Sequence, residues 1–219
     1  MTLFLMASSG PVYGIAIDSL TGNIYYSYYN ADHIMICETT VEFCLKLATA
    51  PDVGQPIGIA VHVEQRYLKC LAMLYFVDSK HFERAFMSLV LLIPYRQVYW
   101  ANRAPLCSIT KANMDGSNAT QIIGGLTHIH SIVVDSETER IYWSDEFSNR
   151  IETIDLEGGD RRTLVAFLGD PRPFGLGIHR NLFYIGNWLA NSIQSVDKYT
   201  GGNRTTLYSA NGHKAACHH

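Results

Sequence analysis

The stretch Arg140-Ile141-Tyr142-Trp143-Ser144-Asp145 decides the fold, because weaker copies of its last four residues recur along the chain at a nearly fixed interval. The copies are Tyr25-Tyr26-Ser27-Tyr28, Tyr99-Trp100-Ala101-Asn102 and Tyr184-Ile185-Gly186-Asn187. Counted from the first Tyr of each copy, the steps are 74, 43 and 42 residues. A repeat of this length indicates an array of similar structural units.

A second marker supports the same repeat. A short apolar run precedes each motif, and the four runs end at Asp18, His62, Asp135 and His179, which are 44, 73 and 44 residues apart. Both markers give a unit of about 43 residues and place surplus sequence in the same interval.

The third unit is the best preserved and contains four segments with strand character. Residues 131–135 form a short apolar run, 140–145 are β-branched and aromatic, 150–156 alternate in polarity, and 163–167 follow a Gly-containing turn. No segment of helical period competes with them. Four strands per unit at this period are typical of a β-propeller blade, so we predict an all-β protein.

The unit resembles the YWTD repeat, the class B repeat of low-density-lipoprotein-receptor-type proteins, whose members close six such units into a propeller. The resemblance covers residues 11–212 apart from the surplus, and it is strongest at Ile141–Asp145 and at Asn149-Arg150-Ile151. It implies a partial β-propeller of about four four-stranded blades, between an N-terminal stub (1–10) and a C-terminal tail (213–219).

Four units are too few for a six-bladed ring, which needs roughly 250 residues. An open array also leaves two apolar faces uncovered. We therefore expect this chain of 219 residues to be a piece of a larger protein or an incomplete gene model, with missing blades or neighbouring modules required.

The surplus lies at residues 67–97, in the turn between two strands of the second unit. Its removal restores the usual repeat and brings Arg66 next to Val98, as Arg140 stands next to Ile141. Two interpretations are open: a real loop that folds onto the propeller or binds a partner, and non-coding sequence carried into the translated chain. We favour the second.

The composition of the chain excludes some classes of function. Hydrophobic residues make up 47% of the chain and charged residues 17%, as in soluble globular proteins, and the net charge of −3 leaves no basic stripe for nucleic acid. Charges interrupt the apolar surplus, so no membrane span is expected. The apolar stretch 2–7 is too short for a signal peptide.

Five cysteines are an odd number and lack metal-site spacing. We expect unpaired thiols. The alternative is a pair between Cys37 and Cys44, which flank a predicted hairpin and could be cross-strand neighbours.

The sequence contains none of the common catalytic or nucleotide-binding motifs, and we predict no catalytic residue, metal or cofactor. The closely spaced His128 and His130 would point to opposite faces of a strand, whereas in a loop both could reach one ion. We favour structural roles for them. Tightly bound calcium would be needed for the remaining enzyme alternative, a six-bladed propeller hydrolase.

The resemblance places a ligand-binding surface at the residue after each motif. These positions are Tyr29, Arg103, Glu146 and Trp188, and His130 and Phe174, just before first strands, should approach the same face. Aromatic and Arg side chains are frequent interface anchors, although ordinary rim packing is the alternative. The resemblance also implies that the last motif residue makes structural hydrogen bonds between strands or blades. This residue is Asp145 and, in weaker form, Asn102 and Asn187.

Two N-glycosylation sequons, at Asn118 and Asn203, both stand two residues after a turn Gly and suit an exposed hairpin of a secreted protein. Repeat register is the competing explanation. The resemblance thus implies a non-enzymatic, extracellular or cell-surface module that binds protein ligands, with a weak indication of a Wnt co-receptor-like protein in Asp197–Gly201. The alternative is a matrix scaffold of nidogen type.

Overall fold

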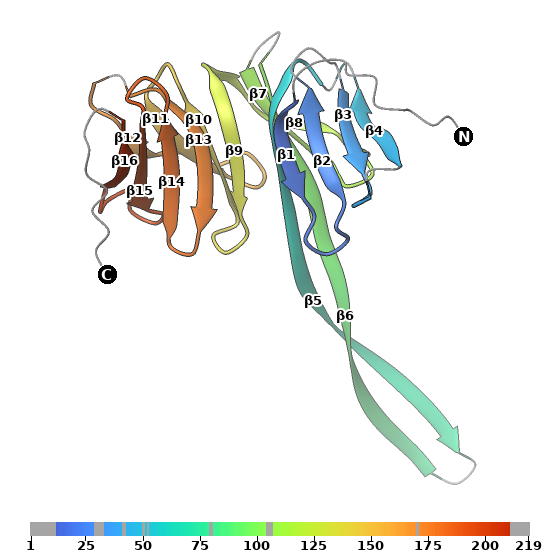
Figure 1. Ribbon diagram of the computed structural model, residues 1–219. Helices are drawn as coiled ribbons and strands as arrows, with labels where there is room; N and C mark the ends of the chain where they lie inside the picture. The colour runs from blue at the N-terminus through green and yellow to red at the C-terminus, as the bar shows by residue number, and fades with distance from the viewer. Residues whose placement is uncertain are drawn as a thin grey trace.

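The computed structural model describes residues 12–28, 33–40, 43–49, 51, 53–78, 81–103, 107–169 and 171–210, and the side chains of these residues apart from 28 and 63–95. Every regular element in this part of the chain is a β-strand, as the sequence predicts. The strands form four four-stranded sheets, each a meander of consecutive antiparallel strands (Figure 1).

The first sheet contains β1 (Val12–Ile17), β2 (Ile24–Tyr28), β3 (His33–Cys37) and β4 (Cys44–Thr49). The second contains β5 (Pro56–Asp78), β6 (His81–Asn102), β7 (Cys107–Asn113) and β8 (Thr120–Leu126). The third contains β9 (Ile129–Asp135), β10 (Arg140–Asp145), β11 (Arg150–Asp155) and β12 (Arg162–Ala166), within two residues of the predicted strands. The fourth contains β13 (Pro173–His179), β14 (Leu182–Asn187), β15 (Ser192–Asp197) and β16 (Thr205–Ser209).

The first two motif residues hold neighbouring sheets together. Adjacent residues of a strand point to opposite faces of its sheet. Trp143 accordingly lies in the core between the second and third sheets, whereas Tyr142 lies in the core between the third and fourth. Trp100 and Tyr99 repeat this arrangement one sheet earlier. Both Trp side chains are completely buried.

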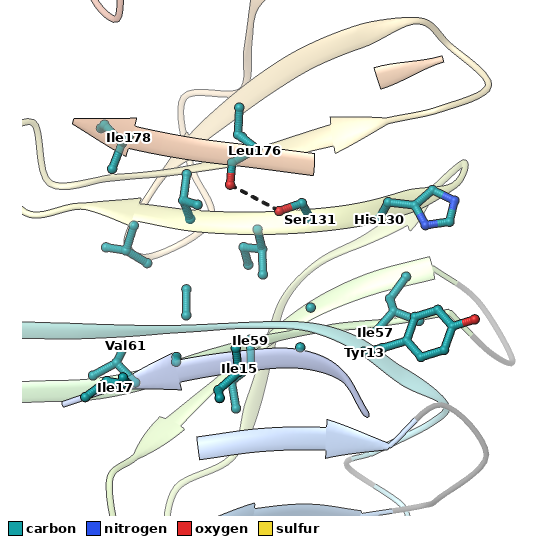
Figure 2. A pocket seen from close by; sticks show the side chains of 17 residues that line it. Tyr13, Ile15, Ile17, Ile57, Ile59, Val61, His130, Ser131, Leu176 and Ile178 are labelled. Carbon is teal, nitrogen blue, oxygen red and sulfur yellow. Dashed lines mark hydrogen bonds between the residues drawn. The ribbon is translucent and has the colours of Figure 1, made fainter. Parts of the chain in front are cut away.

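The innermost strands of the four sheets, β1, β5, β9 and β13, lie side by side in that order. They line a channel of about 410 Å³ whose wall is mostly aliphatic, as Figure 2 shows. Two serines join the third and fourth sheets beside it: Ser144 Oγ donates to the carbonyl of Phe174 at 2.8 Å, and Ser131 Oγ donates to that of Leu176 at 3.4 Å. The sheets are thus arranged around a common axis, as propeller blades are.

The surplus segment continues two strands. β5 and β6 pair without interruption from Gly58↔Ala101 to Asp78↔His81, and Figure 1 shows the resulting hairpin extending far beyond the four sheets. The insertion therefore lengthens the β5–β6 hairpin and leaves the blade register unchanged, which explains why removing it from the sequence restores the repeat. The side chains of 63–95 lie outside the described part.

The expectation of unpaired cysteines is wrong for two of the five. Cys37 and Cys44 are directly opposite each other on β3 and β4, and they form a disulfide. The cross-strand alternative was correct because the intervening turn places the two Cα atoms 4.2 Å apart, close enough for a disulfide. Cys107 is a buried free thiol.

Candidate functional site

In the second, third and fourth blades, the end of the second strand brings together a buried motif residue and a more accessible neighbour. Asn102, Asp145 and Asn187 are buried, with exposed fractions of 6%, 0% and 4%. The next residues, Arg103 and Glu146, are partly exposed, and Trp188 is 67% exposed. The strand end therefore separates a position that faces the scaffold from one that faces the rim.

Two of the buried motif residues, Asp145 and Asn102, bind the segments that lead into their own sheets. Asp145 accepts a hydrogen bond from Thr127 Oγ1 at 2.6 Å and another from the Ser148 amide at 3.0 Å. Asn102 Oδ1 accepts one from the Gly54 amide at 3.0 Å. Burial alone would raise the pKa of Asp145, but these hydrogen bonds outweigh it and lower the pKa. Asp145 and Asn102 thus fasten the connections between consecutive blades, whereas Asn187 Nδ2 donates to Ser192 Oγ at 3.3 Å within its own sheet.

Beside these positions lies a cavity of about 540 Å³, which we call the rim cavity. Its lining consists of Val12, Tyr13, Arg103, His128, His130, Glu146, Phe174 and Trp188. Five of the six residues predicted for a ligand-binding surface lie in this wall. The sixth, Tyr29, lies outside the described residues.

β-Bulges explain how the inner strands reach this cavity. The pairing of β9 with β10 skips His130 between Ile129 and Ser131, and that of β13 with β14 skips Phe174 between Pro173 and Gly175. A bulged residue escapes the alternation of the strand, which re-aims its side chain. Tyr13 occupies the same position on β1. Sequence analysis missed Tyr13, although its place directly before Gly14 was an available signal.

The most polar part of the rim cavity is a cluster of two histidines and a glutamate. His130 Nε2 lies 2.8 Å and His128 Nδ1 lies 3.0 Å from the same carboxylate oxygen of Glu146, Oε2. His128 precedes β9, and His130 is its bulged residue, so the strand geometry that would separate the two rings does not apply. The loop alternative described for this pair matches the geometry.

Two arginines flank the cluster. The Arg103 guanidinium contacts His128 Nε2, and Arg172 NH1 lies 3.4 Å from Glu146 Oε1. Burial would raise the pKa of Glu146, but the hydrogen bond from His130 and the nearby positive charges lower it. Burial lowers the pKa of His130, only partly offset by Glu146. A neutral His130 beside an ionised Glu146 is therefore the favoured state near neutral pH.

Aromatic rings fix the histidines in place. Phe147 stacks on His128 with ring centroids 4.4 Å apart, and Phe174 lies 4.1 Å from His130. Trp188 continues the row, 5.7 Å from Phe174. The rim cavity thus combines an ordered charged cluster with an accessible aromatic wall.

The two sequons lie on hairpin turns away from this cavity. Asn118 and Asn203 are exposed, and both have positive φ, 56° and 51°. Asp160 has the same conformation in the third blade, so it occupies the equivalent position there. Asn and Asp tolerate this backbone region, which gives both asparagines a conformational reason to be there as well.

Comparison with known proteins finds relatives among receptors. No protein-family model matches the chain. The vitellogenin receptor of Solenopsis invicta is 28% identical over 189 residues, 86% of this chain and 9% of the receptor. Human low-density lipoprotein receptor-related protein 4 is 41% identical over 76 residues, 35% of this chain and 4% of that protein. The chain is homologous to low-density-lipoprotein-receptor-related proteins and vitellogenin receptors. It spans less than a tenth of the length of these relatives.

Solved structures agree on the architecture. The nidogen/laminin complex matches with a TM-score of 0.50 at 18% identity, over 94% of this chain and 82% of that one. Virginiamycin B lyase from Staphylococcus aureus, an enzyme, matches with a TM-score of 0.57 at 14% identity, over 92% and 57%. At these identities the likeness concerns the fold alone. The four sheets are therefore blades of a β-propeller. The described residues contain no helix suited to crossing a membrane.

Proposed function

We propose that this receptor-type propeller is a non-enzymatic, extracellular module whose rim cavity binds a segment of a protein ligand. The observation that carries the proposal is the convergence of five residues, chosen from sequence for ligand contact, in the wall of one cavity. A partly exposed Arg beside accessible Phe and Trp side chains suits a protein interface, where such residues supply most of the binding energy.

The first ligand to test is vitellogenin. Two vitellogenin receptors are similar to most of this chain, the one of Solenopsis invicta over 86% of it and the one of Drosophila melanogaster over 88%. A Wnt co-receptor-like role, indicated by the resemblance at Asp197–Gly201, is the second candidate, and low-density lipoprotein receptor-related protein 5 is 32% identical over 45% of the chain. Its support is narrower because the match covers a smaller part of the propeller.

The nidogen likeness supports a third partner class, a laminin-type matrix protein, through the fold alone. For the hydrolase alternative, a calcium assay on the purified chain is decisive: stoichiometric, tightly bound calcium would support it. The sequons at Asn118 and Asn203 are proposed glycosylation sites, and a mass shift removed by glycosidase after secretion would establish them.

A binding assay tests the main proposal. Vitellogenin, a Wnt protein and laminin are passed in turn over the immobilised chain, and the ligand that binds is measured again on Trp188→Ala and Arg103→Ala. We expect the affinity to fall by about 10- to 30-fold in each, as for central interface anchors. Leu189→Ala is the matched control, because Leu189 is exposed beside Trp188 but does not line the cavity. Equal binding by all variants would refute the proposed surface.

A further inference from the structure

The strongest unassigned feature is the convergence of three metal-binding side chains in the wall of the rim cavity. One ligand atom from each of His128, His130 and Glu146 lies within 4.8 Å of the other two. From this geometry we infer that the two imidazoles and the carboxylate bind a divalent transition-metal ion, with zinc as the best-matched species. Two histidines and one glutamate are a donor set that zinc uses in proteins.

The distances are compatible with such an ion. Around a tetrahedral zinc with bonds of about 2.0–2.2 Å, neighbouring donor atoms stand roughly 3.3–3.5 Å apart. His130 Nε2 and His128 Nδ1 lie 2.8 Å and 3.0 Å from Glu146 Oε2. Lengthening these two separations by about half an ångström would bring them to the tetrahedral value, and the two histidine nitrogens lie within 4.8 Å of each other. All three side chains are largely buried, with exposed fractions of 9–12%, so little solvent competes for the donors.

The backbone and the aromatic rings hold this arrangement before any ion arrives. The Glu146 amide donates to the His128 carbonyl at 3.0 Å, which fixes the distance between the two connecting segments. Phe147 and Phe174 pack against the two imidazoles. Preorganised donors lose less conformational entropy when they bind a ligand, which favours binding. The fourth coordination position would face the rim cavity, since all three residues line it.

Binding of the metal ion requires no net release of protons. In the metal-free state His130 donates from Nε2 to the carboxylate, and the contact of Arg103 with His128 Nε2 places the proton of His128 on Nδ1. Coordination through His130 Nε2 and His128 Nδ1 requires each neutral ring to carry its proton on the other nitrogen. Both rings therefore change tautomer, and Arg103 must move away from His128.

Arg103 is thus a competitor of the metal, which gives the proposal a distinctive test. Its positive charge and its contact with His128 both oppose a cation. Replacing Arg103 with Gln should tighten zinc binding, whereas a purely structural cluster of ion pairs would gain no metal affinity from that change. Arg172 opposes the cation more weakly, because it contacts the other carboxylate oxygen, Oε1, at 3.4 Å.

In the experiment the full chain is titrated with Zn²⁺ alone, and calorimetry measures the binding. A second titration uses Co²⁺, and visible absorption measures the binding. Every sample carries His213→Ala, Cys217→Ser, His218→Ala and His219→Ala, because these tail residues could bind metal independently. We expect one ion per chain. Removal of a ligand by Glu146→Gln or His130→Asn should weaken binding by at least about 100-fold, more than typical losses from outer-shell changes.

Arg103→Gln should tighten binding, and His179→Ala, which removes an exposed histidine of β13, should leave it unchanged. Circular dichroism verifies that each variant is folded, and His128→Asn substitutes for any ligand variant that is not. Absence of binding, or equal affinity in the parent and in a folded ligand variant, would overturn the proposal. This outcome is independent of the proposed protein-binding function, since no protein ligand is present.

Discussion

The two faces of the fourth sheet differ sharply. The face toward the third sheet places Phe183, Ile185 and Val196 in a shared core, completely buried. The opposite face presents Ile193 and Tyr208, 45% and 56% exposed, beside a groove of about 430 Å³. Both faces carry apolar side chains, but only one has a neighbouring blade. Each blade of this repeat thus carries apolar side chains on both faces, so that it can pack against a neighbouring blade on either side.

Equivalent glycines show the same contrast at the inner strands. A Cβ atom added to Gly58 would lie 2.9 Å from Ile132 Cγ2 of the next blade, whereas one added to Gly175 would meet nothing within 4 Å. The close approach of inner strands thus requires a small residue where a neighbour is present. The free face of the fourth sheet retains the small residue and the apolar groove that a further blade would use.

The largest predicted effect concerns the covered interface between the second and third blades. Trp143→Ala should lower the free energy of unfolding by about 3–5 kcal/mol, because it removes a completely buried ring from that core. Urea-induced unfolding measures the change. Trp188→Ala, which truncates a Trp that is 67% exposed, should change stability by less than about 0.5 kcal/mol. Similar losses in both variants would contradict the distinction.

The next effect comes from a buried cation that joins the third and fourth blades. Lys198 Nζ lies 2.9 Å from Asp135 and 2.6 Å from Glu137, and Lys198 is 2% exposed. Lys198→Met should cost about 3 kcal/mol in thermal unfolding, because it leaves the Asp135 carboxylate buried without its partner.

Lys111→Met is the matched control for that variant. Lys111 also joins neighbouring blades, but its partner Glu157 is 68% exposed, so a loss below about 1 kcal/mol is expected. A cost for Lys111→Met as large as that for Lys198→Met would show that burial does not govern these contacts.

A smaller effect tests the glycine comparison directly. Gly58→Ala should destabilise the chain by about 1–3 kcal/mol through the clash with Ile132. Gly175→Ala should be nearly neutral in this chain. In a protein with a further blade docked on the fourth sheet, we expect Gly175→Ala to become destabilising as well, and differential scanning calorimetry of both proteins would reveal the change.

The smallest effect concerns Asp145, the last motif residue of the third blade. The second and fourth blades carry Asn at this position. A carboxyl group whose pKa is lower in the folded state stabilises the fold above its unfolded pKa of about 3.9, and this contribution disappears as pH falls through the folded pKa. Asp145→Asn should therefore cost about 1.5 kcal/mol at neutral pH, and the difference from the parent should vanish in strong acid. Melting temperatures measured from about pH 2 to pH 7 test this.

Much of this structure was predictable because the repeat encodes it locally. The spacing of Tyr99, Tyr142 and Tyr184 predicted the blades and their strands. The blade spacing depends on strand periodicity, which a single sequence displays. The placement of Arg103, Glu146 and Trp188 at one rim was implied by the resemblance to the YWTD repeat, which puts the residue after each motif on the ligand-binding face.

Other features depend on contacts that no local pattern reveals. The bulge at His130 turns its ring toward Glu146 beside His128, and alternation along a regular strand predicts the opposite. The Cys37–Cys44 disulfide depends on the cross-strand register of β3 and β4. Arg172 enters the site from the connection before β13, a segment without motif character.

The central claim is that the motif residues build the blades and that the residues after them form the binding surface. Hydrogen–deuterium exchange of the chain with and without its bound protein ligand tests it most directly. We predict protection of the backbone around residues 128–130, 146–148, 172–175 and 187–189, with unchanged exchange at the opposite turns 136–139 and 157–160. Protection confined to those opposite turns, with none at the rim, would contradict the account.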